Sequence, residues 1–158
     1  MTEQRDRRED AEPVELEFFA RPDQLADVRK LIERLAAKTR LNKEEIEDLL
    51  TAADEAAANA IRHGSPRGER SLVKVVCHTL PTALIIEVRD QGAGFAVPGD
   101  SPMPGPDAPG GRGLPLMCAL ADAVEIASSP KGTTITLKKL ARSSGVENIN
   151  SRYSVAEE

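Results

Sequence analysis

The spacing of apolar residues predicts both a strand and a helix in the first part of the chain. Between residues 14 and 18, three apolar residues alternate with two glutamates, and this period-two pattern predicts a half-buried strand. Between residues 22 and 39, apolar residues recur at intervals of three and four, and Pro22 suits an opening helical turn, so a helix is predicted there.

A second helix is predicted over residues 42–64, and both of its ends are marked. Asn42, with Glu45 three positions later, has the pattern of a capping box, and Gly64 followed by Ser-Pro ends the apolar periodicity. The side of this helix that we expect to be buried carries Ile46, Leu49, Leu50, Ala53, Ala57, Ala60 and Ile61.

The remaining pattern predicts a sheet and one more helix. The segments and their predicted states are 71–79 and 83–90 as a hairpin, 91–113 as a long Gly- and Pro-rich loop, 114–122 as a short helix, and 124–127 and 133–139 as strands. This order of elements predicts a two-layer α+β sandwich, in which helices cover one face of a mixed, mostly antiparallel sheet.

The polar ends of the chain limit the predicted folded domain to residues 14–140. Residues 1–13 have almost no apolar side chains and are predicted to be a disordered tail, because they cannot bury enough surface to offset the entropy of ordering. Residues 141–158 are also polar, and we expect a frayed C-terminal tail. A chain of 158 residues has room for one domain with its own core.

Composition narrows the classes of function. With a net charge of -5 and only 3% aromatic residues, the chain offers neither a basic face for a phosphate backbone nor stacking platforms for bases, so we expect no direct nucleic-acid binding. No apolar run approaches the ~20 residues of a membrane span, so we expect no membrane association. Cys77 and Cys118 stand apart in apolar segments, which predicts buried, reduced thiols in a cytoplasmic protein.

Candidate binding residues follow the predicted strand 83–90. Asp90 precedes Gly92 and Gly94, so a carboxylate that can accept a hydrogen bond from an exocyclic amine stands beside a backbone that a planar base can approach closely. Adenine fits this description. An ordinary strand-ending turn uses the same residue types, so the string alone leaves both interpretations open.

Glycines also precede the predicted helix at 114–122. Gly111 and Gly113 flank Arg112, where unpaired backbone N–H groups and the helix dipole would favour an anion such as a phosphate. Arg112 fits a phosphate contact and a solvated surface position equally well. The string matches neither a Walker A loop nor a Rossmann fingerprint, so both of these nucleotide folds are disfavoured.

Glu55 and Asn59 lie four positions apart on the helix predicted over 42–64 and therefore share one face. A carboxylate can act as a general base toward an alcohol, and an amide oxygen can ligate Mg²⁺. For an isolated pair, ordinary polarity of an exposed helix face is the simpler interpretation. The glycine-rich motifs elsewhere in the chain, however, favour the functional interpretation of this pair.

These segments together resemble a known family. The strings EAAANAIRHG, DQGAGF, GGRGLPLM and KGTTITLKK occur in the order and rough spacing of the N, G1, G2 and G3 boxes of the GHKL (Bergerat-fold) ATPase superfamily, over residues 42–139. Within that superfamily the chain resembles the anti-sigma-factor serine/threonine kinases, in which one ATP-binding domain stands alone.

The resemblance implies a role for each candidate residue. Glu55 would be the catalytic base toward a protein serine, Asn59 the Mg²⁺ ligand, and Asp90 the acceptor of the adenine amino group. The residues implied to shape the base pocket and the phosphate site are Gly92, Gly94, Gly111, Arg112, Gly113 and Thr133.

The same resemblance implies ATP and Mg²⁺ as cofactors, with an anti-anti-sigma (STAS-domain) protein and a sigma factor as partners and a homodimer as an option. Two alternatives stay open: a non-catalytic module that binds ATP or ADP to switch partners, and a detached histidine-kinase ATPase domain. Pro115 departs from the family pattern, because it removes a backbone donor near the implied phosphate site. In the first turn of a helix, however, proline is tolerated.

Overall fold

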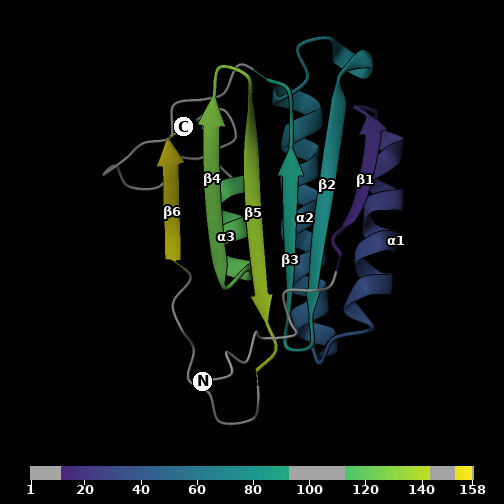
Figure 1. Cartoon of the computed structure of the whole chain (residues 1–158), viewed down its shortest axis with the longest axis vertical. Helices are drawn as coiled ribbons and strands as arrows, with labels where there is room; N and C mark the ends of the chain where they lie inside the picture. The colour runs from purple at the N-terminus through teal and green to yellow at the C-terminus, as the bar shows by residue number, and fades with distance from the viewer. Residues whose placement is uncertain (1–11, 93–112, 143–151, 158) are drawn as a thin grey trace, which may run out of the picture.

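The computed structural model describes residues 12–92, 113–142 and 152–157, which form one sheet with a layer of helices on one side (Figure 1). The strands are β1 (Val14–Phe19), β2 (Leu72–Leu80), β3 (Ala83–Arg89), β4 (Ala123–Ser129), β5 (Gly132–Leu140) and β6 (Arg152–Glu157). The helices are α1 (Leu25–Ala36), α2 (Lys43–His63) and α3 (Gly113–Leu120), with the 3-10 turns η1 (Pro22–Gln24) and η2 (Gly68–Arg70). The helix predicted from Pro22 thus begins as a 3-10 turn, and the other predicted elements differ from the observed ones by small shifts of their ends.

The sheet has the strand order β1-β2-β3-β5-β4-β6 in the part of the chain that the structure describes. In the described sheet, four pairs of neighbouring strands are antiparallel: β1 with β2, β2 with β3, β3 with β5, and β5 with β4. The edge strand β6 runs parallel to β4. The three α-helices lie behind the same face of the sheet in Figure 1, and α2 packs against β2, β3 and β5. The predicted two-layer α+β sandwich with a mixed, mostly antiparallel sheet is confirmed.

The predicted frayed tail over 141–158 is wrong for one segment, because residues 152–157 form β6 at the edge of the sheet. The sequence RYSVAE places two good strand formers, Tyr153 and Val155, at alternate positions. Pairing with β4 also gives hydrogen-bond partners to backbone groups along an edge that would otherwise be open. The polar composition of the tail concealed this short strand.

The core lies between the sheet and the helix layer. Along β5, buried and half-buried residues alternate, so one face of this strand is covered by the helices and the other is open. The buried residues of α2 that belong to the apolar core are Leu49, Leu50, Ala52, Ala53, Ala56, Ala57 and Ala60, whereas the predicted Ile46 and Ile61 are half-buried. The buried side of α2 is wide because α1 packs on one flank of this helix and α3 on the other.

The predicted capping box fixes the start of α2. The Asn42 side chain accepts a hydrogen bond from the Glu45 amide at 2.8 Å, and Glu45 Oε1 accepts one from the Asn42 amide at 2.9 Å. Glu45 Oε2 accepts a third hydrogen bond from the Arg142 amide at 3.0 Å, and Glu45 is only 5% exposed. One side chain therefore joins the start of α2 to the chain that follows β5.

Cys77 and Cys118 are buried free thiols, as predicted, and burial raises the pKa of Cys77 to about 11. Within the described ranges, no helix combines the length and the apolar character that crossing a membrane would require.

Candidate functional site

The end of β3, the start of β5 and the end of α2 meet at one end of the sheet. Asp90 directly follows β3, Thr133 is the second residue of β5, and Gly64 is the C-cap of α2. Gly92 lies two residues beyond Asp90. Residues from three separate segments of the sequence, including the predicted Asp90, Gly92 and Thr133, therefore form one site.

Three hydrogen bonds fix the position of Asp90. Its Oδ1 atom accepts from the backbone N–H of Gly92 at 2.9 Å and from that of Thr133 at 3.0 Å. The backbone N–H of Asp90 donates to the carbonyl of Thr133 at 2.9 Å. Because two backbone donors hold one oxygen, the carboxylate cannot rotate without losing both of them.

Glycines give the Asp90 carboxylate its space. A Cβ atom on Gly64 would collide with this carboxylate, and a Cβ atom on Gly92 would lie 2.8 Å from Gly64 Cα. Gly132 has a φ of 153°, and a Cβ atom there would collide with the Asp90 carbonyl oxygen. The backbone therefore closes around Asp90 from three directions, and each approach needs a residue without a side chain.

The second carboxylate oxygen, Oδ2, faces Gly64 and accepts no hydrogen bond from the residues that the structure describes. Burial raises the pKa of Asp90, while the hydrogen bonds from Gly92 and Thr133 oppose this rise. A partly desolvated carboxylate, with one oxygen that no described residue hydrogen-bonds, is suited to bind a donor group on a ligand, such as the amino group of a base.

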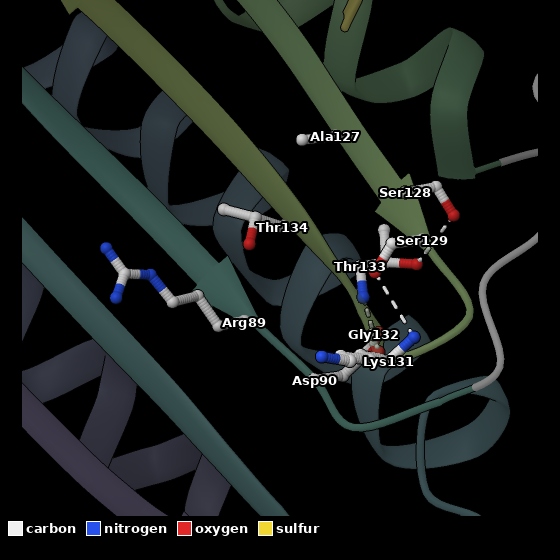
Figure 2. A pocket seen from close by; sticks show the side chains of 9 residues that line it. All are labelled: Arg89, Asp90, Ala127, Ser128, Ser129, Lys131, Gly132, Thr133 and Thr134. Atoms are coloured by element: carbon white, nitrogen blue, oxygen red, sulfur yellow. Dashed lines mark hydrogen bonds between the residues drawn. The ribbon is translucent and has the colours of Figure 1, made fainter. Parts of the chain in front are cut away.

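Beside Asp90 lies a cavity of about 450 Å³ that Figure 2 shows at the turn between β4 and β5. Its described lining residues are Arg89, Asp90, Ala127, Ser128, Ser129, Lys131, Gly132, Thr133 and Thr134. Ser128 Oγ lies 3.2 Å from Thr133 Oγ1, so hydroxyl groups border the cavity near the carboxylate. The cavity is open to solvent, with Arg89 and Lys131 exposed at its edge, and its walls supply several hydrogen-bonding groups.

Glu55 and Asn59 lie in the C-terminal half of α2, nine and five residues before its C-cap Gly64. Both are half-buried, and the carbonyl of Asn59 accepts a hydrogen bond from the Gly64 amide at 3.3 Å. They continue a stripe that begins at Asp48 and Ala52, since these positions recur at intervals of three and four along the helix. Asp48 contacts Lys139, which in turn contacts the last carbonyl of α3, so the stripe faces the α3 side of α2.

Another flank of α2 contacts α1. Asp54, the neighbour of Glu55, pairs with Arg29 of α1 at 3.0 Å. The helix therefore uses one polar side to contact α1 and presents Glu55 on another. None of the described residues that line the cavity belongs to α2, so Glu55 and Asn59 are not part of its described wall.

The structure describes only some of the residues that were predicted to lie at the phosphate site. Gly113 is the first residue of α3, where unpaired backbone N–H groups are expected, and Pro115 lies in the same first turn. Pro115 therefore removes no intrahelical hydrogen bond, in agreement with the expectation that proline is tolerated in the first turn of a helix. The other predicted residues, Gly94, Gly111 and Arg112, lie outside the described residues.

Sequence reasoning missed the contribution of Gly64 and Gly132 to the site. Gly64 was predicted only to end α2, yet its φ of -98° is open to any residue, so its role is to leave room for Asp90. The sequence signal that could have assigned Gly64 to the site is its position directly after the helix that carries the N box. Gly132 comes directly before the predicted strand 133–139, and only the pairing of β3 with β5 shows that it lies against Asp90.

Comparison with known proteins gives a family and several relatives. Residues 18–139 match the model of a family described as the histidine kinase-like ATPase domain. The serine-protein kinase RsbW of Bacillus licheniformis is 29% identical over 147 residues, covering 87% of this chain and 91% of its own. The anti-sigma F factor of Clostridium novyi is 29% identical over 136 residues, covering 82% and 95%.

Solved structures share the fold. The RsbU and RsbW domains of Rv1364c from Mycobacterium tuberculosis match with a TM-score of 0.63 at 21% identity, over 84% of this chain and 34% of that one. A histidine kinase domain from Erythrobacter litoralis matches with a TM-score of 0.50 at 17% identity, over 75% and 60% of the two chains. At these identities the likeness concerns the fold alone.

Proposed function

The chain belongs to the histidine kinase-like ATPase domain family, and from this premise we propose that it is an ATP-dependent anti-sigma factor and protein serine kinase. Relatives named serine-protein kinase RsbW and anti-sigma F factor align with more than four fifths of the chain. These names confirm the kinase and anti-sigma functions that the sequence predicted, and membership of an ATPase family implies the use of ATP.

The observation that carries the proposal is the fixed carboxylate of Asp90. Oδ1 is held by two backbone donors, and Oδ2 is left to accept a hydrogen bond from the amino group of adenine. Gly92 leaves the backbone bare beside the base, and the buried Thr133 closes the other side. The pocket would thus recognise adenine by one hydrogen bond and by its flat shape.

Mg²⁺ is the further cofactor that we propose. In the described residues there is no cluster of three or more acidic, histidine or cysteine side chains that could hold a metal ion alone. A single amide oxygen from Asn59 fits Mg²⁺, which commonly binds few protein groups and completes its shell with phosphates and water. When bound, the ion would neutralise charge on the phosphates. Gly94, Gly111, Arg112 and the first turn of α3 at Gly113 are proposed to contact the nucleotide directly.

Glu55 is the proposed catalytic residue. Its carboxylate would accept the proton of a serine hydroxyl on a partner protein while the serine oxygen bonds to the γ-phosphorus. The bond between that phosphorus and the bridging oxygen of the β-phosphate breaks, and ADP leaves. Glu55 is half-buried and lies one helical turn before Asn59, so both side chains project from the same face of α2, which supports the proposed pairing of a base with a metal ligand.

The proposed protein partners are a STAS-domain anti-anti-sigma protein as the phosphoryl acceptor and a sigma factor as the sequestered ligand. The cytoplasm is the proposed location, because both partners belong there. A homodimer is a further proposal. Direct binding of nucleic acid or of a membrane forms no part of the proposed function.

A pair of matched variants tests the role of Glu55. Glu55→Gln keeps the size of the side chain but removes the base, whereas Glu47→Gln makes the same change at an exposed position of α2. With labelled ATP and a STAS-domain substrate, we expect Glu55→Gln to lose phosphoryl transfer by about 100-fold or more and to retain ATP binding. Glu47→Gln should transfer at the wild-type rate.

Two results would redirect the proposal. Retained transfer by Glu55→Gln would reject the role of this residue as the base. If the wild-type chain binds ATP and releases its partner on binding, but never transfers phosphate, the chain is the non-catalytic partner-switching module. A detached histidine-kinase domain would instead phosphorylate a histidine on a partner, which acid treatment of the labelled product distinguishes from phosphoserine.

A further inference from the structure

A buried lysine lies at the other end of the sheet from Asp90. Lys139, near the end of β5, is 3% exposed. Its Nζ atom donates to the carbonyl of Leu120 at 2.6 Å and to Asp48 Oδ2 at 3.4 Å. A lysine is rarely buried unless it has such partners, because desolvation of the charge is costly. These two contacts bring β5, α2 and α3 together at a single atom.

The partners of Lys139 suit its charge. Leu120 is the last residue of α3, where the unpaired carbonyl groups and the helix dipole favour a cation. Asp48 supplies a negative charge from α2. Backbone contacts support the same corner, since Asp122 Oδ2 accepts from the Leu140 amide at 2.6 Å. Hydrogen bonds from Lys139 and Leu140 therefore hold the end of α3 and the residues after it against the end of β5.

The positions along the two helices connect this corner to the nucleotide site. α2 ends at Gly64 beside Asp90, whereas α3 ends at Leu120 beside Lys139 at the other end of the sheet, so these two packed helices run in opposite directions. The eight residues of α3 rise by about 12 Å. The eight residues from Asp48 to Glu55 on α2 likewise rise by about 12 Å. Counted from the Lys139 corner, the start of α3 and Glu55 of α2 are therefore the same number of residues away.

We propose that Lys139 is a positioning residue: by fixing the end of α3 to Asp48, it sets the height of the first turn of α3 relative to Glu55 and Asn59. Resting on the proposed function, this inference means that Lys139 places the phosphate-binding end of α3 opposite the base, although it touches neither the nucleotide nor the serine. The base pocket at Asp90 does not depend on it, because Asp90 and Thr133 are held by their own hydrogen bonds.

The test compares Lys139→Met with Lys138→Met in the full chain. Both changes remove one lysine charge from β5, but Lys138 is on the open face of the sheet, away from α2 and α3. Binding of Mg-ATP by calorimetry and of adenosine by NMR titration separates the two parts of the site. We expect Lys139→Met to weaken ATP binding about tenfold relative to Lys138→Met and to leave adenosine binding within about twofold.

Each other outcome has a defined meaning. Unchanged ATP affinity in Lys139→Met, or an equal loss for ATP and adenosine, would overturn the positioning role. If Lys139→Met does not fold, Asp48→Asn at a partly exposed site replaces it. A selective loss of ATP affinity in that variant supports the inference, and an unchanged affinity rejects it. If wild-type protein binds neither ligand, the proposed nucleotide function fails.

Discussion

At the scale of single residues, the site depends as much on missing side chains as on present ones. The sequence predicted the carboxylate of Asp90 because its chemistry is visible in the string DQGAGF. It did not predict that Gly64 and Gly132 make room for Asp90, since a steric requirement between distant segments leaves no local pattern. Residue types that bind can be inferred from sequence, whereas the space around them requires the fold.

Two glycines that flank the turn after α2 make a matched test of this point. Gly64→Ala places a methyl group against the Asp90 carboxylate, and we expect it to destabilise the fold by about 1–3 kcal/mol through overpacking and to weaken nucleotide binding. Gly68→Ala meets no atom within 4 Å but has a φ of 59°. It should cost about 1 kcal/mol through backbone strain alone.

Urea unfolding and ATP titration of the two variants measure these effects separately. The steric account of Gly64 requires that only Gly64→Ala loses affinity for the nucleotide. Equal affinities in both variants would show that Asp90 can move without harm.

At the scale of elements, strong local signals gave correct predictions. The capping box at Asn42 and Glu45 fixed the start of α2, because both of its hydrogen bonds lie within four residues. β6 was missed, because its partner strand β4 lies far from it in the sequence and the segment around it is polar. The third hydrogen bond of Glu45, which it accepts from the Arg142 amide, was also not predicted, because the two residues lie far apart in the sequence.

The double task of Glu45 leads to a prediction on stability. Glu45→Ala removes the reciprocal cap and the hydrogen bond that the Arg142 amide donates to Glu45, so we expect a loss of about 2 kcal/mol in the free energy of unfolding. Glu44→Ala, at an exposed position in the same first turn, should change it by only about 0.5 kcal/mol or less. Urea denaturation followed by circular dichroism measures both, and equal losses would show that the burial of Glu45 has no consequence.

At the scale of the whole molecule, the fold divides the proposed labour between its layers. The sheet end at Asp90 and Thr133 holds the proposed base pocket, the α2 face carries Glu55 and Asn59, and α3 begins where the phosphates are proposed to lie. The order of the four sequence boxes predicted this division, because each box falls on a different element. Gly94, Gly111 and Arg112 stay predictions, since the described residues do not include them.

The central claim is that Asp90 forms a nucleotide site, and Asp90→Asn tests it without unfolding the protein. The amide oxygen can still accept from Gly92 and Thr133. Burial raises the pKa of Asp90, so the native carboxyl retains its proton longer than the unfolded one as pH rises from 3.8, and its ionisation costs stability at neutral pH. Asp90→Asn removes that charge and should be at least as stable as wild type at pH 7.

The decisive measurement is the affinity for Mg-ATP of wild type and Asp90→Asn by calorimetry at pH 7, with folding checked by circular dichroism. In the variant an amide N–H₂ donor takes the place of Oδ2 and faces the donor amino group of adenine. We therefore expect ATP affinity to fall by about 100-fold in a fully folded protein. An affinity for ATP equal to that of wild type would contradict the assignment of Asp90 and, with it, the proposed nucleotide site.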